Sequence, residues 1–216
     1  MVLAKVYSAA YIGFDGRPII VECDITNGLP SIVIVGLGNK AIDESKERIR
    51  SGIKNSDLIM PRKRITLNLA PADLPKDGSS YDLPMAVAIL AASQQLPPKY
   101  LVDSLFAGEI SLDGNIKPVR GIINHVEVAK QLKLKRVFVP AENADQACLV
   151  GDIDIVAVES LKQLTMILTD QQSLEIHTPI TQSAPESHRG VIDFADIYGQ
   201  QHAKRALEIA VAGNHN

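Results

Sequence analysis

Residues 108–119 read Gly108-Glu109-Ile110-Ser111-Leu112-Asp113-Gly114-Asn115-Ile116-Lys117-Pro118-Val119, and this stretch decides the fold prediction. Two extended runs, Leu105 to Leu112 and Asn115 to Val119, flank its Asp113-Gly114 pair. An Asp-Gly pair readily adopts the positive backbone φ of a tight turn between strands, so it is the strongest short-range hairpin signal in the chain. The stretch therefore predicts a β-hairpin.

The sequence before the hairpin predicts strands first and helices later. Residues 19–25 alternate between apolar and polar side chains, the period of a half-buried strand, between turn signals at Asp15-Gly16 and Asn27-Gly28. The segment Tyr81–Ser93 is apolar nearly all round, which indicates a buried helix. The other predicted elements are a strand at Ser31–Val35, a helix at Asn39–Lys54 and a strand at Lys63–Ala70.

The helix at residues 39–54 has two distinct faces. Ile42, Ile49 and Ile53 share one face, which predicts that it is buried. Glu44 and Arg48 are four residues apart, and we expect them to pair on the outer face.

After the hairpin, helical and extended patterns alternate. They predict helices at Ile122–Leu132, Ala141–Leu149 and Leu161–Leu168, and strands at Arg136–Val139 and Ile153–Val158. Strands followed by alternating helices and strands predict an α/β domain with a mixed (α+β) sheet, covering residues 1–169.

The C-terminal part has a different composition. Residues 170–190 lack periodicity and are rich in Gln, Ser, Thr and Pro, which predicts a linker. Residues 191–216 then begin a new pattern, with a helix at Gln200–Ala212 whose apolar stripe has nothing to pack against. We therefore expect 191–216 to be the truncated start of a further domain.

The composition excludes several classes of protein. With 46% hydrophobic and 22% charged residues and a formal charge of −3, the chain is an ordinary globular protein without bulk attraction to DNA or membranes. No apolar run reaches the roughly 20 residues of a membrane span, and no signal peptide is expected. A chain of this size with only two cysteines has no disulfide framework, which indicates a reducing compartment, so we expect a cytoplasmic location. Neither cysteine has metal-ligand spacing from any of the five histidines, so we expect no metal site.

Three stretches carry a family resemblance. Pro75-Lys76-Asp77-Gly78-Ser79-Ser80 resembles the segment that holds the nucleophilic serine of Lon proteases. The hairpin at 108–119 is similar to a hairpin of the same family. Residues 196–200 with 203–208 look like the entry to the AAA+ module of magnesium-chelatase-type ATPases. A Lon-like domain followed by such a module is the architecture of the ComM/YifB group, which this sequence resembles.

The resemblance implies a fold and a function. The fold is the Lon-protease-like fold, also described as ribosomal-protein-S5-domain-2-like. The implied function is that of a non-catalytic N-terminal domain in a hexameric AAA+ ATPase that promotes DNA branch migration during natural transformation and recombination. ATP and magnesium are expected as cofactors of the whole homo-oligomer, and none is expected in this part. The alternatives are an ATP-dependent serine peptidase of the Lon type and a magnesium-chelatase-like motor subunit.

Ser80 is the candidate nucleophile, because helix-terminal N–H groups after it could stabilise an oxyanion. We favour the simpler interpretation that Ser79 or Ser80 caps the following helix. The serine needs a base, which in Lon proteases is a lysine, but the ungapped match places Ile123 there. His125 is the only residual candidate. Lon has Ala-Gly where this chain has Tyr81-Asp82, and we expect that ring and charge to obstruct a substrate, so no catalytic residue is predicted.

Two binding hypotheses remain. Arg62-Lys63-Arg64 is the only dense basic run, and it is either a phosphate-contacting edge for DNA or a solvated strand start. Ile197-Tyr198-Gly199 matches a segment that borders the adenine in AAA+ proteins. No phosphate-binding loop occurs in the 216 residues, so we expect no tight nucleotide site in this part of the protein.

Overall fold

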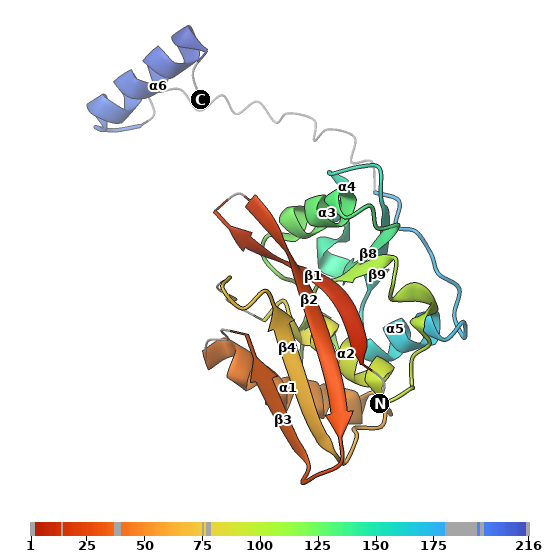
Figure 1. Ribbon diagram of the computed structural model, residues 1–216. Coiled ribbons are helices and arrows are strands. Elements are labelled where there is room, and N and C mark those ends of the chain that lie inside the picture. The colour runs from red at the N-terminus through yellow and green to blue at the C-terminus, as the bar shows by residue number, and fades with distance from the viewer. Residues whose placement is uncertain are drawn as a thin grey trace. The chain divides into compact units, whose positions relative to one another are not determined.

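The main sheet is built from strands of both halves of the first 160 residues. They are Ala4–Ile12 (β1), Asp15–Thr26 (β2), Ser31–Val35 (β3), Arg64–Ala70 (β4), Ser104–Phe106 (β5), Arg136–Pro140 (β8) and Asp154–Val158 (β9). Their order is β3-β4-β2-β1-β5-β8-β9 (Figure 1). β2 is antiparallel to β1 and β4, whereas the other neighbouring pairs are parallel. The predicted mixed α/β fold is confirmed.

The computed structural model describes residues 3–13, 15–36, 40–74, 76, 79–179, 194 and 197–214. The chain divides into two compact units, with the boundary between Pro179 and Ile180. The helices are Lys40–Asn55 (α1), Asp82–Ala92 (α2), Ile122–Gln131 (α3), Ala144–Cys148 (α4), Leu161–Leu168 (α5) and Gln201–Gly213 (α6). No helix in the described part of the chain is long and apolar enough to cross a membrane.

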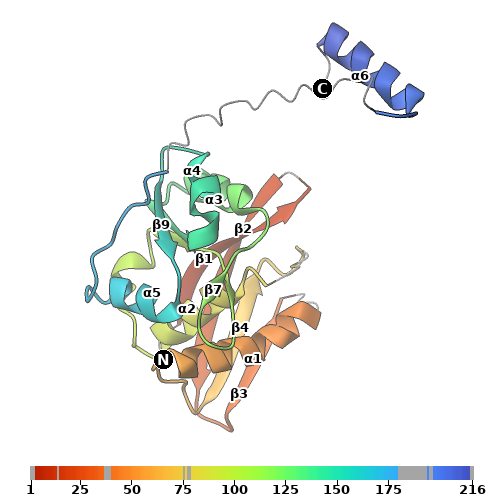
Figure 2. The same cartoon turned by 180° about the vertical axis from the view of Figure 1, so that it is seen from behind.

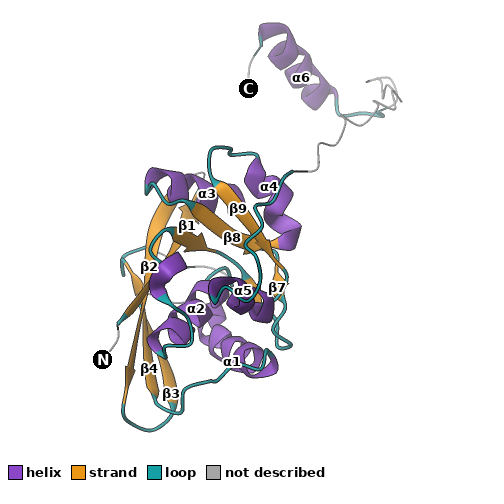
Figure 3. Cartoon of the chain, turned by 90° about the vertical axis from the view of Figure 1, so that its right-hand side faces the viewer, coloured by secondary structure: helices purple, strands orange, loops and turns teal. Residues whose placement is uncertain are grey.

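The helices cover both faces of the sheet because neighbouring strand residues point to opposite sides. On β5, Leu105 packs with the apolar residues of α3 and α4, whereas Phe106 packs with those of α2 and α5. Phe106 stacks on Phe138 of β8, with the ring centroids 4.8 Å apart. Figures 2 and 3 show α1, α2 and α5 on one side of the sheet and α3 and α4 on the other.

The predicted hairpin is present but shorter than expected. Glu109–Ile110 (β6) pairs antiparallel with Ile116–Lys117 (β7), and Gly114 has φ +89° at the turn. The run from Leu105 to Leu112 is not one strand, because its first residues belong to β5 in the main sheet. The hairpin is held to the second half of the unit by a hydrogen bond from the Leu161 N–H to the Gly114 carbonyl (2.9 Å).

The prediction for α1 is half right. Ile42, Ile49 and Ile53 are buried, as expected. Arg48 is not on an outer face, since its guanidinium donates hydrogen bonds to the carboxylate of Asp82 on α2. The phase of the helix placed Arg48 away from the three isoleucines, but it could not show that α2 lies on that side.

Two segments at the ends of predicted elements also differ from expectation. Asp15 and Gly16 are the first residues of β2 rather than the turn before it, paired with Ile12 and Tyr11. Residues 170–179, the start of the predicted linker, are held on the first unit. Asp170 binds Lys99 and Tyr100 there.

Candidate functional site

Ser79 and Ser80 end the loop that precedes α2. The N-cap of α2 is Tyr81, and no side chain caps it, so the predicted serine cap is wrong. The Ser79 hydroxyl instead donates to the carboxylate of Glu109 on β6. Ser80 is buried, with 7% of its surface exposed. Lys76, earlier in the loop, donates to the carbonyls of Pro71 and Leu74, and these hydrogen bonds fix the loop. Residues 75, 77 and 78 lie outside the described ones.

The first two backbone donors of α2 are engaged by the protein itself. The Asp82 N–H donates to the Ser79 carbonyl (3.1 Å), and the Leu83 N–H donates to the Gly108 carbonyl (3.0 Å). The Gly108 N–H donates to the Ser80 carbonyl (3.1 Å), so this loop is bonded to the chain that leads into the hairpin. An oxyanion hole needs N–H groups directed at the reacting oxygen. The first N–H groups of α2 are directed elsewhere.

The pocket beside the serines has a volume of about 420 Å³ and is lined by Tyr11, Ser79, Ser80, Glu109, Pro118, Val119 and Arg120. Neither Ile123 nor His125 lines it. The Ile123 side chain cannot accept a proton, and 37% of its surface is exposed. His125 is fully buried, its Nδ1 lies 3.0 Å from the Gly121 carbonyl, and burial lowers its pKa.

Tyr81 and Asp82 do not obstruct this pocket, which corrects the sequence prediction. Both are buried, with 2% and 0% of their surfaces exposed. The Asp82 carboxylate accepts hydrogen bonds from Arg48 Nε (2.6 Å), from Arg48 Nη2 (3.1 Å) and from the Ile110 N–H (3.2 Å). Burial raises the pKa of the Asp82 carboxyl, and the hydrogen bonds from Arg48 oppose that rise. These residues tie α1, α2 and β6 together.

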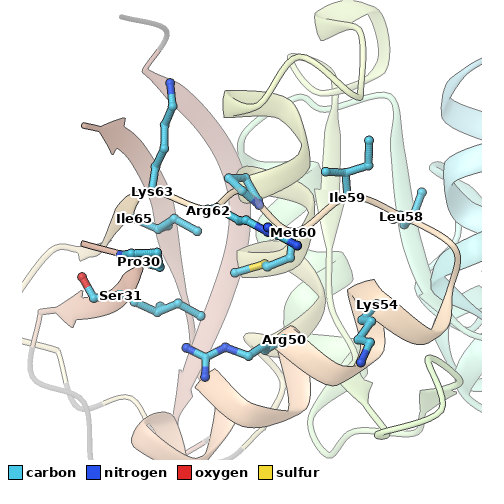
Figure 4. A pocket seen from close by; sticks show the side chains of 12 residues that line it. Pro30, Ser31, Arg50, Lys54, Leu58, Ile59, Met60, Arg62, Lys63 and Ile65 are labelled. Atoms are coloured by element: carbon cyan, nitrogen blue, oxygen red, sulfur yellow. The ribbon is translucent and has the colours of Figure 1, made fainter. Parts of the chain in front are cut away.

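A second cavity, which we call the basic cleft, lies between α1 and the segment that leads into β4. Its volume is about 600 Å³, and Arg50, Lys54, Arg62 and Lys63 are its basic lining residues (Figure 4). Two of the three residues in the predicted basic run therefore line it, whereas Arg64 does not. Arg50 and Lys54 could not be assigned to this site from the sequence, because only the packing of α1 beside residues 58–63 brings them to the run.

The nucleotide-site prediction concerns the second unit. Tyr198 is 96% exposed, Ile197 is 40% exposed and Gly199 has φ +72°. Lys204 of α6 donates to the Ile197 carbonyl, which fixes the segment before the helix. Among the residues described, no group of three His, Cys, Asp or Glu could hold a metal ion.

The sheet order and the helices on both of its faces define a mixed α/β module. Residues 21–143 match the family model described as "Subunit ChlI of Mg-chelatase", and residues 193–216 match "Magnesium chelatase, subunit ChlI". The chain belongs to this magnesium-chelatase ChlI family, among AAA+ proteins.

Relatives within the ComM/YifB group match the whole chain. It is 40% identical over 218 residues to competence protein ComM of Haemophilus influenzae and 39% identical over 216 residues to YifB of Salmonella typhimurium. These matches cover 100% of this chain but 43% and 42% of those proteins, so the chain spans less than half of their length. The similarity to Lon protease 2 of Bacillus subtilis is partial, at 38% identity over 98 residues, 44% of this chain and 17% of that protein.

Proposed function

We propose that the whole protein is a hexameric, cytoplasmic AAA+ ATPase that promotes DNA branch migration during natural transformation and recombination. The observation that carries this proposal is the 40% identity to competence protein ComM over the whole of this chain. Since the chain spans 43% of that relative, the motor activity belongs to the proposal for the whole protein.

The role proposed for residues 1–169 is non-catalytic. Three features of the serine loop support it. Ser79 donates to Glu109, the first N–H groups of α2 bond to carbonyls of the chain, and Ile123 stands where the resemblance places a lysine. A serine hydroxyl without an adjacent base is a poor nucleophile, so Ser80 is expected to be inert.

The phosphates of the nucleotide and its magnesium ion would be held outside these 216 residues. Ile197, Tyr198 and Gly199 offer one apolar edge for an adenine ring, and the exposed Tyr198 ring fits that role. The 216 residues contain no phosphate-binding loop, so they would not hold a nucleotide tightly by themselves.

Branch migration by the complete protein tests the proposal directly. Purified complete protein is incubated with a labelled branched DNA junction, with ATP and magnesium or with a non-hydrolysable analogue. We expect the junction to be resolved only where ATP is hydrolysed. ATP hydrolysis without movement of the junction would contradict the proposal. Magnesium insertion into a porphyrin would favour the chelatase alternative, which the name of the family suggests.

The non-catalytic role has its own test. Casein and a fluorogenic peptide are incubated with the wild type and with Ser80→Ala. We expect no cleavage by either protein. Cleavage by the wild type that disappears in Ser80→Ala would restore the peptidase alternative.

A further inference from the structure

The basic cleft concentrates positive charge in a chain whose formal net charge is −3. Four of its twelve lining residues are basic, and none is acidic. Arg50 has an acidic neighbour, Glu47, at 3.2 Å, but both side chains are largely exposed, so this pair is weak. Lys54 and Arg62 are exposed, and neither has an ion pair within the residues that the structure describes. Their charges remain free to bind an anion.

The cations come from both walls of the cleft. Figure 4 shows Arg50 and Lys54 extending from α1, and Arg62 extending from the segment before β4. Lys63 points away from the other three in this view, so a ligand in the cleft would meet the charges of Arg50, Lys54 and Arg62. A ligand in the cleft would meet positive charge along its length rather than at one point.

The uncharged part of the lining limits the kind of ligand. Ile32, Met60 and Ile65 are among its apolar residues, and no lining residue is aromatic. Proteins that hold single nucleotides or unpaired bases commonly stack them on aromatic rings. This cleft provides no ring, so it suits the phosphates of a nucleic acid rather than its bases.

We propose that the basic cleft binds the phosphodiester backbone of DNA, without sequence specificity, through Arg50, Lys54 and Arg62. The inference rests on the proposed function for its choice of DNA, and it assigns that contact to residues 1–169. Phosphate contacts fix the position of a protein on DNA but carry no sequence information. The cleft would therefore hold DNA while the motor acts on it.

The register of β4 separates Arg64 from this site. Ile65, Leu67 and Leu69 point toward the helices, so Arg64, Thr66 and Asn68 point to the opposite face of the sheet. Arg64 is exposed there and is absent from the cleft lining. The predicted run Arg62-Lys63-Arg64 is thus divided between two faces, which provides a control within the run.

Salt-dependent binding by the full 216-residue chain tests the inference. Binding to a fluorescein-labelled forked DNA is measured by anisotropy across a salt series, for the wild type and for Arg50→Gln/Lys54→Gln/Arg62→Gln. Each lost phosphate contact lowers the slope of log affinity against log salt by about one. We expect the triple variant to lose about three units of slope, equally for forks of different sequence.

The matched control removes the same charge elsewhere. Arg64→Gln/Lys117→Gln/Lys133→Gln also removes three exposed positive charges, none of them in the cleft. We expect its slope to stay within about one unit of the wild type. Circular dichroism checks that both variants fold. If the triple cleft variant does not fold, Arg62→Gln alone, which lies in an exposed segment, replaces it in the binding measurement.

Three results would overturn the inference: no DNA binding by the wild type at low salt, equal losses in the cleft and control variants, or displacement of DNA by stoichiometric ATP or triphosphate. None of these measurements involves ATP hydrolysis. If the cleft does not bind DNA, the proposal of branch migration by the complete protein is still open to its own test. If the complete protein does not move a junction, the DNA binding measured for the cleft is unaffected.

Discussion

Replacing Asp82 by alanine tests the pairing of Arg48 with Asp82, which ties three elements of the first unit. The Asp82 side chain is fully buried and that of Arg48 is 20% exposed. In Asp82→Ala the guanidinium keeps its charge but loses both hydrogen bonds to the carboxylate, and the Ile110 N–H loses its acceptor. Removing one partner of a buried ion pair costs about 3–5 kcal/mol. We expect a loss of that size.

Urea unfolding followed by circular dichroism measures the effect. With an m value of about 2 kcal/mol/M, the midpoint of Asp82→Ala should fall by about 1.5–2.5 M. Glu47→Ala is the matched control, since it breaks the exposed pair with Arg50 on the same helix, at a cost below about 1 kcal/mol. If Asp82→Ala and Glu47→Ala lose the same free energy of unfolding, the buried pair of Arg48 and Asp82 does not stabilise the fold more than an exposed pair does.

The pH dependence of Arg48→Met provides a second readout. Without the guanidinium, nothing on Arg48 opposes the rise in the pKa of the buried Asp82 carboxyl. A carboxyl whose pKa is higher in the folded state than in the unfolded state binds protons more tightly when folded, so stability falls as pH rises through the folded-state pKa. The stability deficit of Arg48→Met should therefore be larger at pH 7 than at pH 5. Replacing both residues, in Arg48→Met/Asp82→Leu, should recover much of the loss.

Three further predictions concern other parts of the first unit. Gly16→Ala should destabilise the protein by about 1–3 kcal/mol in urea unfolding, because the new Cβ would lie 2.6 Å from a side-chain carbon and 2.7 Å from a backbone oxygen of α3. Burial raises the pKa of the Cys23 thiol to about 12, so iodoacetamide at pH 8 should alkylate Cys148 first and Cys23 only after unfolding, as read by peptide mass. The hydrogen bond from Asn68 lowers the pKa of the Glu22 carboxyl below 4.5. The stabilisation that the ionised Glu22 contributes is therefore present above pH 4.5 and lost on acidification. Between pH 5 and pH 3, Asn68→Ala should lose less stability than the wild type, as measured by urea unfolding at each pH.

Periodicity predicted the elements that are amphipathic or buried throughout. The alternation on β2 and the isoleucine face of α1 gave the right faces, since burial of apolar side chains dominates there. The hairpin turn followed from the special backbone preference at Asp113-Gly114. These signals are local, and local signals can be read without knowing the topology.

Partners across the fold could not be predicted in this way. The sequence paired Arg48 with Glu44 on an outer face, but it could not show that Arg48 binds Asp82, 34 residues away, because α1 and α2 pack side by side. The serines were assigned to a helix cap, but Ser79 bonds to Glu109 on β6. In both cases a polar side chain bonds to a strand or helix whose position only the tertiary structure defines.

The basic cleft follows from the packing of α1, and this links the stability of the first unit to the proposed DNA contact. Ile49 and Ile53 point into the core, so Arg50 and Lys54, each one residue further on, are turned about 100° around the helix. The bond from Arg48 to Asp82 ties α1 to α2, and Arg50 and Lys54 line the cleft together with Arg62. Asp82 is the first residue of α2, directly after the loop that resembles a protease site. Two residues beyond the serine to which the resemblance assigns chemistry, this chain therefore has a buried ion pair, and that ion pair holds the helix that carries two residues of the proposed DNA contact.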